Sequence, residues 1–167
     1  MEKEEIEMTI NSMKDTYLEE IINNHYEQTE EDLEIVDRVL AYRKMSVPLK
    51  LTVKDHHYAT VLRKTGTLPP EIMFDEKYVH IETILNTIAV GGKDVGAFLV
   101  TLTRAEKVEK RMGKPNAMAC MNLQEVYDRY LKNSDYLGIM IYGGNSPYPI
   151  SIERIKRILN IKEENDN

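Results

Sequence analysis

Short apolar runs and amphipathic stretches alternate between residues 97 and 159, and this alternation is the clearest pattern in the chain. The runs at residues 97–102, 117–120 and 136–142 are too short for core helices and are typical of buried strands. Stretches with helical apolar spacing follow, and each begins at a residue that favours helix N-termini: Thr103, Asn122 and Ser151. Strands joined by crossover helices predict a parallel or mixed sheet with helices packed on it.

Earlier in the chain the pattern predicts two helices and a strand. A narrow apolar stripe predicts a helix over residues 2–24, and a second helix is predicted from Thr29. Strict alternation over residues 47–53 predicts a half-buried strand, and Pro48 indicates either an edge strand or the first residues of one. We expect residues 58–63 to be its hairpin partner.

The stretch 78–90 fits both a helix and a strand. Its apolar residues include a set at helical spacing, but its β-branched content and the glycines that follow favour a hairpin with residues 97–102. Together the patterns predict an α+β fold with a central mixed β-sheet and packed helices. We expect this domain to cover residues 29–161, after an acidic helical arm at residues 1–28 and before a disordered tail at residues 162–167.

Composition narrows the class of protein. The chain has 167 residues and one cysteine, which suits a single domain that needs no disulfide framework. The acidic N-terminus lacks the apolar segment of a signal peptide, and no apolar run approaches the roughly 20 residues that span a bilayer. We therefore expect a cytoplasmic protein that does not enter a membrane.

The charge is unevenly distributed. The net charge is −6, yet residues 1–34 hold twelve acids and two lysines, a net of −10, while the rest of the chain is net positive. An acidic arm of this kind suits contact with a basic protein partner, although a solvated helical face has the same composition. A basic ridge from Arg104 to Lys114 is diluted by two glutamates, so we expect no nucleic-acid role.

The residues with the most chemical promise are Asp55, His56 and His57, which could relay a proton or bind a metal. Neighbouring side chains on a strand point to opposite faces, so a polar loop explains the triplet equally well. Cys120 lies in an apolar run and is expected to be buried and structural. No cofactor loop or metal-ligand spacing stands out, so we expect neither cofactor nor metal.

The glycine turn after residue 142 and the tyrosines near it are the remaining candidates. Gly143, Gly144 and Asn145 lie between a predicted strand and a predicted helix, where backbone amides can hold an anion. A tight turn that needs positive φ explains them without a ligand. Five of the ten tyrosines fall between Tyr127 and Tyr148, a density that suits either a protein interface or the edge of a core.

The order of these elements resembles the N-terminal domain of SseB-like proteins over roughly residues 29–161. In that family a strand ends in a Phe-Thr-Ser-like step into a helix, and Leu102-Thr103-Arg104 is the corresponding step. A late family strand turns into the last helix, as residues 141–147 do here. The resemblance implies an α+β domain without established catalysis, whose bacterial relatives include proteins suggestive of toxin-immunity or other protein-binding work.

We therefore expect a non-catalytic bacterial protein-binding domain, an immunity or regulatory protein that occludes a partner. The alternative is a small hydrolase that uses Asp55, His56 and His57. Both the identity of the partner and the oligomeric state stay open. The residues expected to contact the partner are acids of the arm, tyrosines and the glycine turn: Glu4, Glu5, Glu19, Glu20, Tyr127, Tyr130, Tyr142, Tyr148, Gly143, Gly144 and Asn145.

Overall fold

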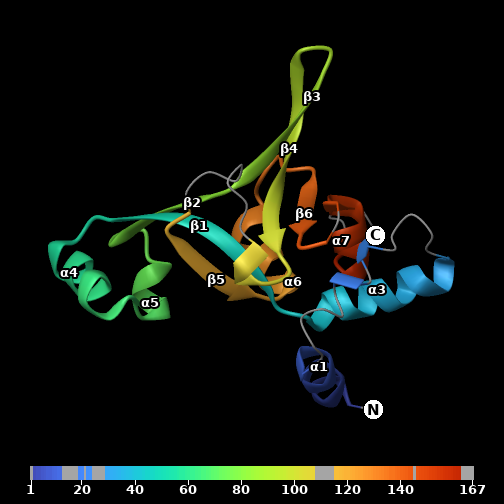
Figure 1. Ribbon diagram of the computed structural model, residues 1–167, viewed down its shortest axis with the longest axis horizontal. Coiled ribbons are helices and arrows are strands. Elements are labelled where there is room, and N and C mark those ends of the chain that lie inside the picture. The colour runs from blue at the N-terminus through green and yellow to red at the C-terminus, as the bar shows by residue number, and fades with distance from the viewer. Residues whose placement is uncertain are drawn as a thin grey trace.

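The computed structural model describes residues 2–12, 19–20, 22–23, 29–107, 115–144 and 146–162. Within these residues, seven strands form one mixed sheet with helices packed against it, which is the predicted α+β fold (Figure 1). The strands are β1 (Met45–Val53), β2 (Val79–Thr83), β3 (Leu85–Val90), β4 (Lys93–Leu102), β5 (Ala117–Met121), β6 (Gly138–Tyr142) and β7 (Tyr148–Ser151).

Strand β1 connects the two halves of the sheet. It pairs antiparallel with β5 over residues 45–49, with β2 over residues 49–53, and with β4 at Ser46. The expectation that Pro48 marks an edge strand is therefore wrong. Pro48 has no amide to donate, but it is buried and faces Met118 of β5.

Strands β4 and β6 run parallel, with Phe98 opposite Gly138 and Leu102 opposite Tyr142. The antiparallel strand β7 then pairs with β6. The hairpin favoured for residues 78–90 is confirmed for residues 85–90, because β3 pairs antiparallel with β4 from Leu85 opposite Leu99 outwards. Residues 79–83 instead form β2, which pairs with β1. Strand β7 was not predicted, and Pro149 lies within it on the exposed side.

The helices are α1 (Lys3–Ser12), α3 (Glu30–Tyr42), α4 (His56–Thr65), α5 (Pro70–Met73), α6 (Leu123–Val126) and α7 (Ile152–Ile158). A π-helical turn, η4 (Tyr127–Leu131), continues α6, and a short 3₁₀ turn, η2 (Ala105–Lys107), follows β4. Residues 19–20 and 22–23 are also helical. Three predicted segments lie partly outside the described residues. They are the rest of the predicted first helix, residues 108–114 of the predicted basic ridge, and the predicted tail after residue 162.

Helix α4 occupies the place where a hairpin strand was expected at residues 58–63, and that prediction is wrong. The Asp55 carboxylate accepts from the backbone amide of Tyr58 and caps the start of the helix. Gly66, at φ 76°, ends the helix in the left-handed conformation and donates its amide to the Leu62 carbonyl. The two caps decide the conformation of a run whose composition alone is ambiguous.

The caps of α6 and α7 form as predicted. Asn122 accepts from the amide of Glu125, and Ser151 accepts from the amide of Arg154. Both helices then turn apolar residues towards the sheet: Leu123 and Val126 from α6, and Ile155 from α7, are buried.

The main core lies between one face of the sheet and helices α3, α6 and α7. Alternate residues of several strands point into it, such as Leu99 of β4 and Ile139 of β6, which are fully buried. A smaller cluster on the opposite face holds Val100, Leu102 and Met140. The N-terminal arm contributes to the main core through Ile10 and Ile22, of which Ile22 is fully buried.

Candidate functional site

The outer part of β3 and β4 projects from the body of the protein as a two-stranded hairpin (Figure 1). We define the projecting hairpin as residues 85–96. Strand β6 begins to pair with β4 only at Phe98, so from Ile88 to Gly96 the two strands of the described chain pair only with each other. A shift in register between Ile88 and Ala89 makes Val95 the extra residue of a β-bulge in β4. Each outer edge consequently presents backbone amides and carbonyls that have no ladder partner among the described residues.

The tip of the projecting hairpin is tightly turned. Gly91 and Gly92 have φ values of 60° and 79°, and the pairing of Val90 with Lys93 closes a two-residue turn around them. Two consecutive positive φ angles are the signature of a type I′ turn, whose twist matches that of the flanking strands. The hairpin is therefore a pre-formed element.

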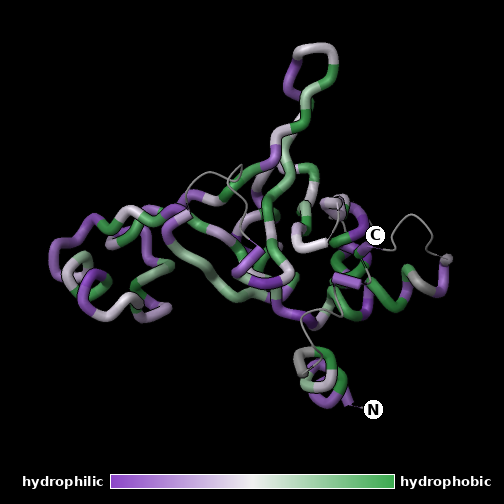
Figure 2. Tube along the Cα trace, viewed as in Figure 1, coloured by the Kyte–Doolittle hydropathy of each residue, from purple (hydrophilic) through white to green (hydrophobic). Residues whose placement is uncertain are grey.

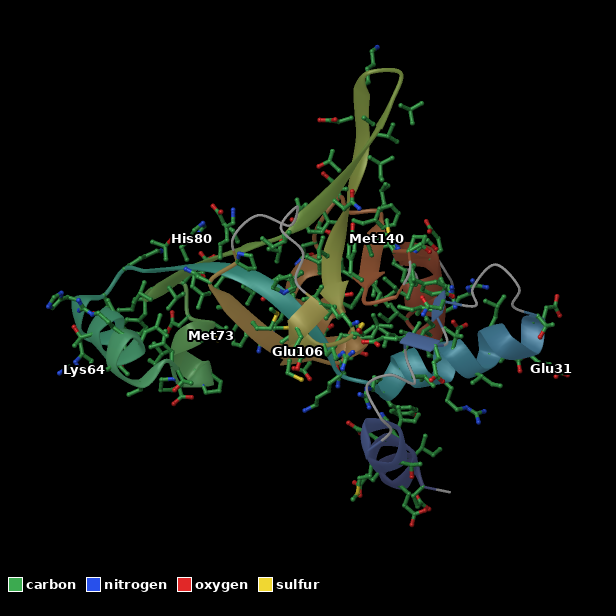
Figure 3. All side chains as sticks on the ribbon, viewed as in Figure 1. Glu31, Lys64, Met73, His80, Glu106 and Met140 are labelled. Carbon is green, nitrogen blue, oxygen red and sulfur yellow. The ribbon has the colours of Figure 1, made fainter. Side chains whose placement is uncertain are left out.

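The projecting hairpin carries exposed apolar side chains. Val90 is 67% exposed and Val95 is 58% exposed, and Leu85 nearer the body is also exposed. Figure 2 shows hydrophobic positions reaching towards the tip, and Figure 3 shows that the side chains near the tip point into open space. Lys93 and Asp94 add one charge of each sign beside the turn. Apolar residues held away from the core in this way are typical of an interaction surface.

A cluster of polar and charged side chains lies where the parallel strands β4 and β6 end. Thr103, just after β4, is 4% exposed, and its hydroxyl donates to Glu19 Oε1 at 3.0 Å. Arg104 Nε lies 2.9 Å from the same oxygen, and Lys107 Nζ lies 3.8 Å from it. The side chain of Glu19 is only 10% exposed, so the arm places a buried carboxylate against two cations. We name Thr103, Arg104 and Lys107 the carboxylate cradle.

The glycine turn after β6 packs beside the carboxylate cradle. A Cβ at Gly143, where φ is 147°, would collide with Thr103 Oγ1. A Cβ at Gly144 would collide with Asn23 Oδ1 and crowd Ile22. The glycines are thus required by close packing and, at Gly143, by positive φ, as the turn interpretation predicted. Asn145 lies outside the described residues.

A cavity of about 440 Å³ lies beside the π-helical turn. Its lining includes Arg129 and Tyr130 from that turn, Phe74 after α5, and Val79 and Ile81 of β2. The Arg129 guanidinium stacks 3.8 Å from the centre of the Phe74 ring. The Tyr130 hydroxyl is buried without a hydrogen-bond partner among the described residues, and burial raises the pKa of Tyr130 despite the nearby charge of Arg129.

The candidate catalytic triplet does not converge. Asp55 caps α4, while His56 and His57 lie in its first turn and are exposed. The ring of His57 packs edge-on against Tyr58. In the part of the chain that the structure describes, no three histidine, cysteine, aspartate or glutamate side chains gather closely enough to hold a metal ion. The triplet thus serves as a helix start.

The tyrosines expected at an interface lie mostly inside. Tyr127, Tyr142 and Tyr148 are 7%, 6% and 3% exposed, and so cannot contact a partner unless the fold opens. The hydroxyl of Tyr142 accepts from Asn86 of β3, and that of Tyr148 accepts from Arg154. The observed positions therefore match the core-edge explanation for these three residues, and Tyr130 is half-buried beside the cavity.

The acids of the arm divide into two groups. Glu4 and Glu5 are exposed in the first turn of α1, and Glu20 is exposed as well. Glu19 is buried against the carboxylate cradle and is not part of the exposed acidic surface. Cys120 also differs from the prediction, because it lies on the exposed face of β5 and is free.

Sequence reasoning missed the reach of the projecting hairpin. The strand was predicted to begin at Ala97, whereas β4 begins at Lys93 and is twice as long as β6. The available signal was Val95, an apolar residue between Asp94 and Gly96, which continues the strand towards the glycine turn.

Within the described ranges, no helix is both long and apolar enough to cross a bilayer. Comparisons with protein-family models, with curated proteins and with solved structures found no match to this chain.

Proposed function

We propose that this chain is a protein-binding domain that holds its partner through the projecting hairpin. The observation that carries the proposal is the pair Val90 and Val95, two exposed valines on a pre-formed hairpin that leaves the body of the fold. Isolated two-stranded hairpins are at best marginally stable in water. A hairpin that extends past its sheet is therefore more stable when a partner covers its apolar side chains.

Two features of the projecting hairpin favour binding. The free backbone edges allow a partner strand to add to β3 or β4, with main-chain hydrogen bonds for affinity and the valines for specificity. The tight glycine turn fixes the hairpin before binding, so less conformational entropy is lost on association.

The exposed acids Glu4, Glu5 and Glu20 support a basic partner, because a net-negative arm raises the encounter rate with a cationic surface. An immunity or regulatory protein that occludes a basic partner, as the resemblance to SseB-like proteins implies, is the concrete form of this proposal. The hydrolase alternative has less support, since Asp55 is engaged as a helix cap and the two histidines are exposed.

The test replaces both valines with serine, in the variant Val90→Ser/Val95→Ser. The full chain and the variant are used to capture partners from the native organism by cross-linking and affinity purification. The partner is then produced and its Kd is measured by calorimetry. We expect the double variant to bind at least about tenfold more weakly, the loss that follows from two exposed anchors of about 1 kcal/mol each.

The matched control is Met8→Ser/Leu33→Ser, which removes two other exposed apolar side chains from α1 and α3. It should bind as the parent does, and both variants should keep the parent's melting temperature. Equal affinity for the parent and the hairpin variant would exclude the hairpin as the docking element. A substrate turned over by the purified protein, with turnover abolished in His56→Ala, would favour the hydrolase alternative instead.

A further inference from the structure

We infer that the carboxylate cradle is a second binding site, one that takes an acidic helical peptide, and that Glu19 of the chain's own arm occupies it as an internal ligand. The cradle consists of Thr103, Arg104 and Lys107, and it lies where β4 and β6 end. This inference does not depend on the function of the projecting hairpin.

The position of the cradle matches that of ligand sites in other sheets. The strands β4 and β6 are the parallel pair of the described sheet, and the chain leaves both at the same edge, at Thr103 and at Gly143. In open α/β sheets, ligands bind outside the carboxyl ends of the parallel strands, and the cradle lies at the corresponding end of this one parallel pair in the otherwise antiparallel sheet of the described residues. In this chain, that position is filled by residues 19, 22 and 23 of the arm.

The contacts to Glu19 are those of a carboxylate-recognition site. One carboxylate oxygen accepts from the buried Thr103 hydroxyl and lies 2.9 Å from Arg104 Nε, and the other lies 3.4 Å from Arg104 Nη2. Lys107 adds a second positive charge at 3.8 Å. Hydrogen bonds to charged groups are the stronger ones, and the Thr103 hydroxyl and Arg104 Nη2 donate to different oxygens of the carboxylate, while Arg104 Nε contributes an ion pair without a hydrogen bond.

The arm also indicates which residue should accompany the glutamate in a peptide that binds the cradle. Ile22, three residues after Glu19, is fully buried in the main core, and Gly144 leaves room for it and for Asn23. Residues three apart share one face of a helix. The ligand class is therefore a helical peptide with a glutamate followed three residues later by isoleucine or a similar apolar residue.

The arm can occupy the cradle with a short segment because it belongs to the same chain. A ligand segment on the same chain has an effective concentration on the order of millimolar, so it excludes free peptides of moderate affinity. A partner peptide of the same pattern gains access once the arm is weakened, and it then releases the arm. The cradle is thus a site that the arm closes in the resting state.

The experiment measures binding of a fluorescent peptide with the sequence of residues 16–24 to the full chain and to Glu19→Gln. We expect the variant to bind the peptide at least about tenfold more tightly than the parent, since the lost carboxylate contacts weaken the internal competitor. A peptide with glutamine in place of the glutamate should not bind. Adding Arg104→Gln to Glu19→Gln should abolish binding.

The matched control is Glu4→Gln, which removes the same charge from an exposed side chain in the first turn of α1 and should behave as the parent. Circular dichroism at the assay temperature verifies that each variant is folded. If Glu19→Gln does not fold, Glu19→Asp keeps the charge but shortens the reach to Thr103, and peptide binding should again exceed that of the parent. A folded position-19 variant that does not bind the peptide, or that binds the glutamine peptide equally well, would overturn the inference.

Discussion

Arg154 of α7 and Asp37 of α3 are 117 residues apart in the chain and form a close ion pair. Arg154 Nε donates to Asp37 Oδ1 at 2.9 Å, and Nη2 lies 2.7 Å from the same oxygen. Arg154 Nη1 also donates to the Tyr148 hydroxyl at 2.9 Å, so one guanidinium joins two helices and β7. Burial opposes the charged form, yet the hydrogen bonds to Tyr148 and Asp37 prevail and raise the pKa of Arg154.

Replacing Arg154 by methionine should therefore destabilise the fold. Methionine keeps the apolar stem but leaves Asp37 and Tyr148 without their shared partner, and we expect a loss of about 2 kcal/mol in the free energy of unfolding. Urea denaturation monitored by circular dichroism measures this loss. Arg157→Met on the exposed side of the same helix is the control and should cost less than about 0.5 kcal/mol. Similar losses in the two variants would show that the ion pair contributes nothing specific.

Replacing tyrosine by phenylalanine should have opposite effects on stability at Tyr148 and at Tyr130. Tyr148→Phe removes the hydroxyl that accepts from Arg154 and should cost about 1 kcal/mol. Tyr130→Phe removes a buried hydroxyl that has no partner among the described residues, so it should leave the free energy of unfolding unchanged or raise it by up to about 1 kcal/mol. A destabilising Tyr130→Phe would mean that the hydroxyl has a partner, such as a bound water.

Tyr130 should also make the free energy of unfolding depend on pH. Burial raises its pKa in the folded chain above the ordinary value of 10.0. The stability linked to the neutral phenol is therefore fully present below that value and is lost as the pH rises through the higher folded pKa. Relative to the parent, Tyr130→Phe should lose less stability over this alkaline range, as measured by urea denaturation at a series of pH values.

Gly143 should tolerate alanine much less well than Gly92 does. Both have positive φ, but alanine can adopt the φ of 79° at Gly92 for about 1–2 kcal/mol, whereas the φ of 147° at Gly143 lies in a region that is largely restricted to glycine. At Gly143 the added methyl group would also collide with Thr103, whereas at Gly92 nothing lies within 4 Å of it. We expect at least about 3 kcal/mol of destabilisation for Gly143→Ala, and a melting temperature well below that of Gly92→Ala would report the added cost of the collision and of the glycine-only backbone conformation. Equal melting temperatures for the two variants would mean that Gly143 does not pack closely against Thr103.

Local signals were sufficient for much of the fold. Asn122 and Ser151 cap their helices as predicted, because a cap and the amide it accepts from are three residues apart and are visible in sequence. The hairpin of β3 and β4 was predicted for the same reason, since its turn and its alternation are contiguous. At residues 58–63, the composition suggested a strand, and the caps Asp55 and Gly66 that decide for a helix lie outside that run.

Long-range relations could not be predicted in the same way. The contact between Glu19 and Thr103 spans 84 residues, and an acidic, amphipathic arm has the same composition whether its glutamates are exposed or buried. The face of Cys120 was equally hidden, because every residue of β5 is apolar and no alternation distinguishes the two sides. The carboxylate cradle therefore emerges only when the arm, the end of β4 and the glycine turn are brought together.

The free thiol of Cys120 should react quickly in the folded protein. It lies on the exposed side of β5, between the buried residues Ala119 and Met121. We expect one equivalent of thiol to react with a disulfide reagent at native pH, at a rate within about tenfold of that in urea, since exposure governs access to the thiolate. If the thiol reacted only after denaturation, Cys120 would be buried, as the apolar sequence around it predicts.

The last prediction concerns the acids that could steer a basic partner. Glu4, Glu5 and Glu20 are exposed, whereas Glu19 is held against Arg104 and Lys107, so of these four acids Glu19 contributes least to a long-range field. Reversing Glu4 and Glu5 to lysine should slow association with the partner that the projecting hairpin captures and should leave the melting temperature unchanged. Glu19→Lys should instead lower the melting temperature, because it buries a third cation beside Arg104 and Lys107.

Stopped-flow association at several salt concentrations separates these effects. Steering predicts that the parent's on-rate falls as salt screens the field and that the Glu4/Glu5 reversal reduces this slope. Lys3→Glu, which adds an acid to the same helix, is the control of opposite sign and should raise the on-rate. An on-rate that is independent of salt, with the reversal variant as fast as the parent, would remove the arm from the encounter and leave binding to the projecting hairpin alone.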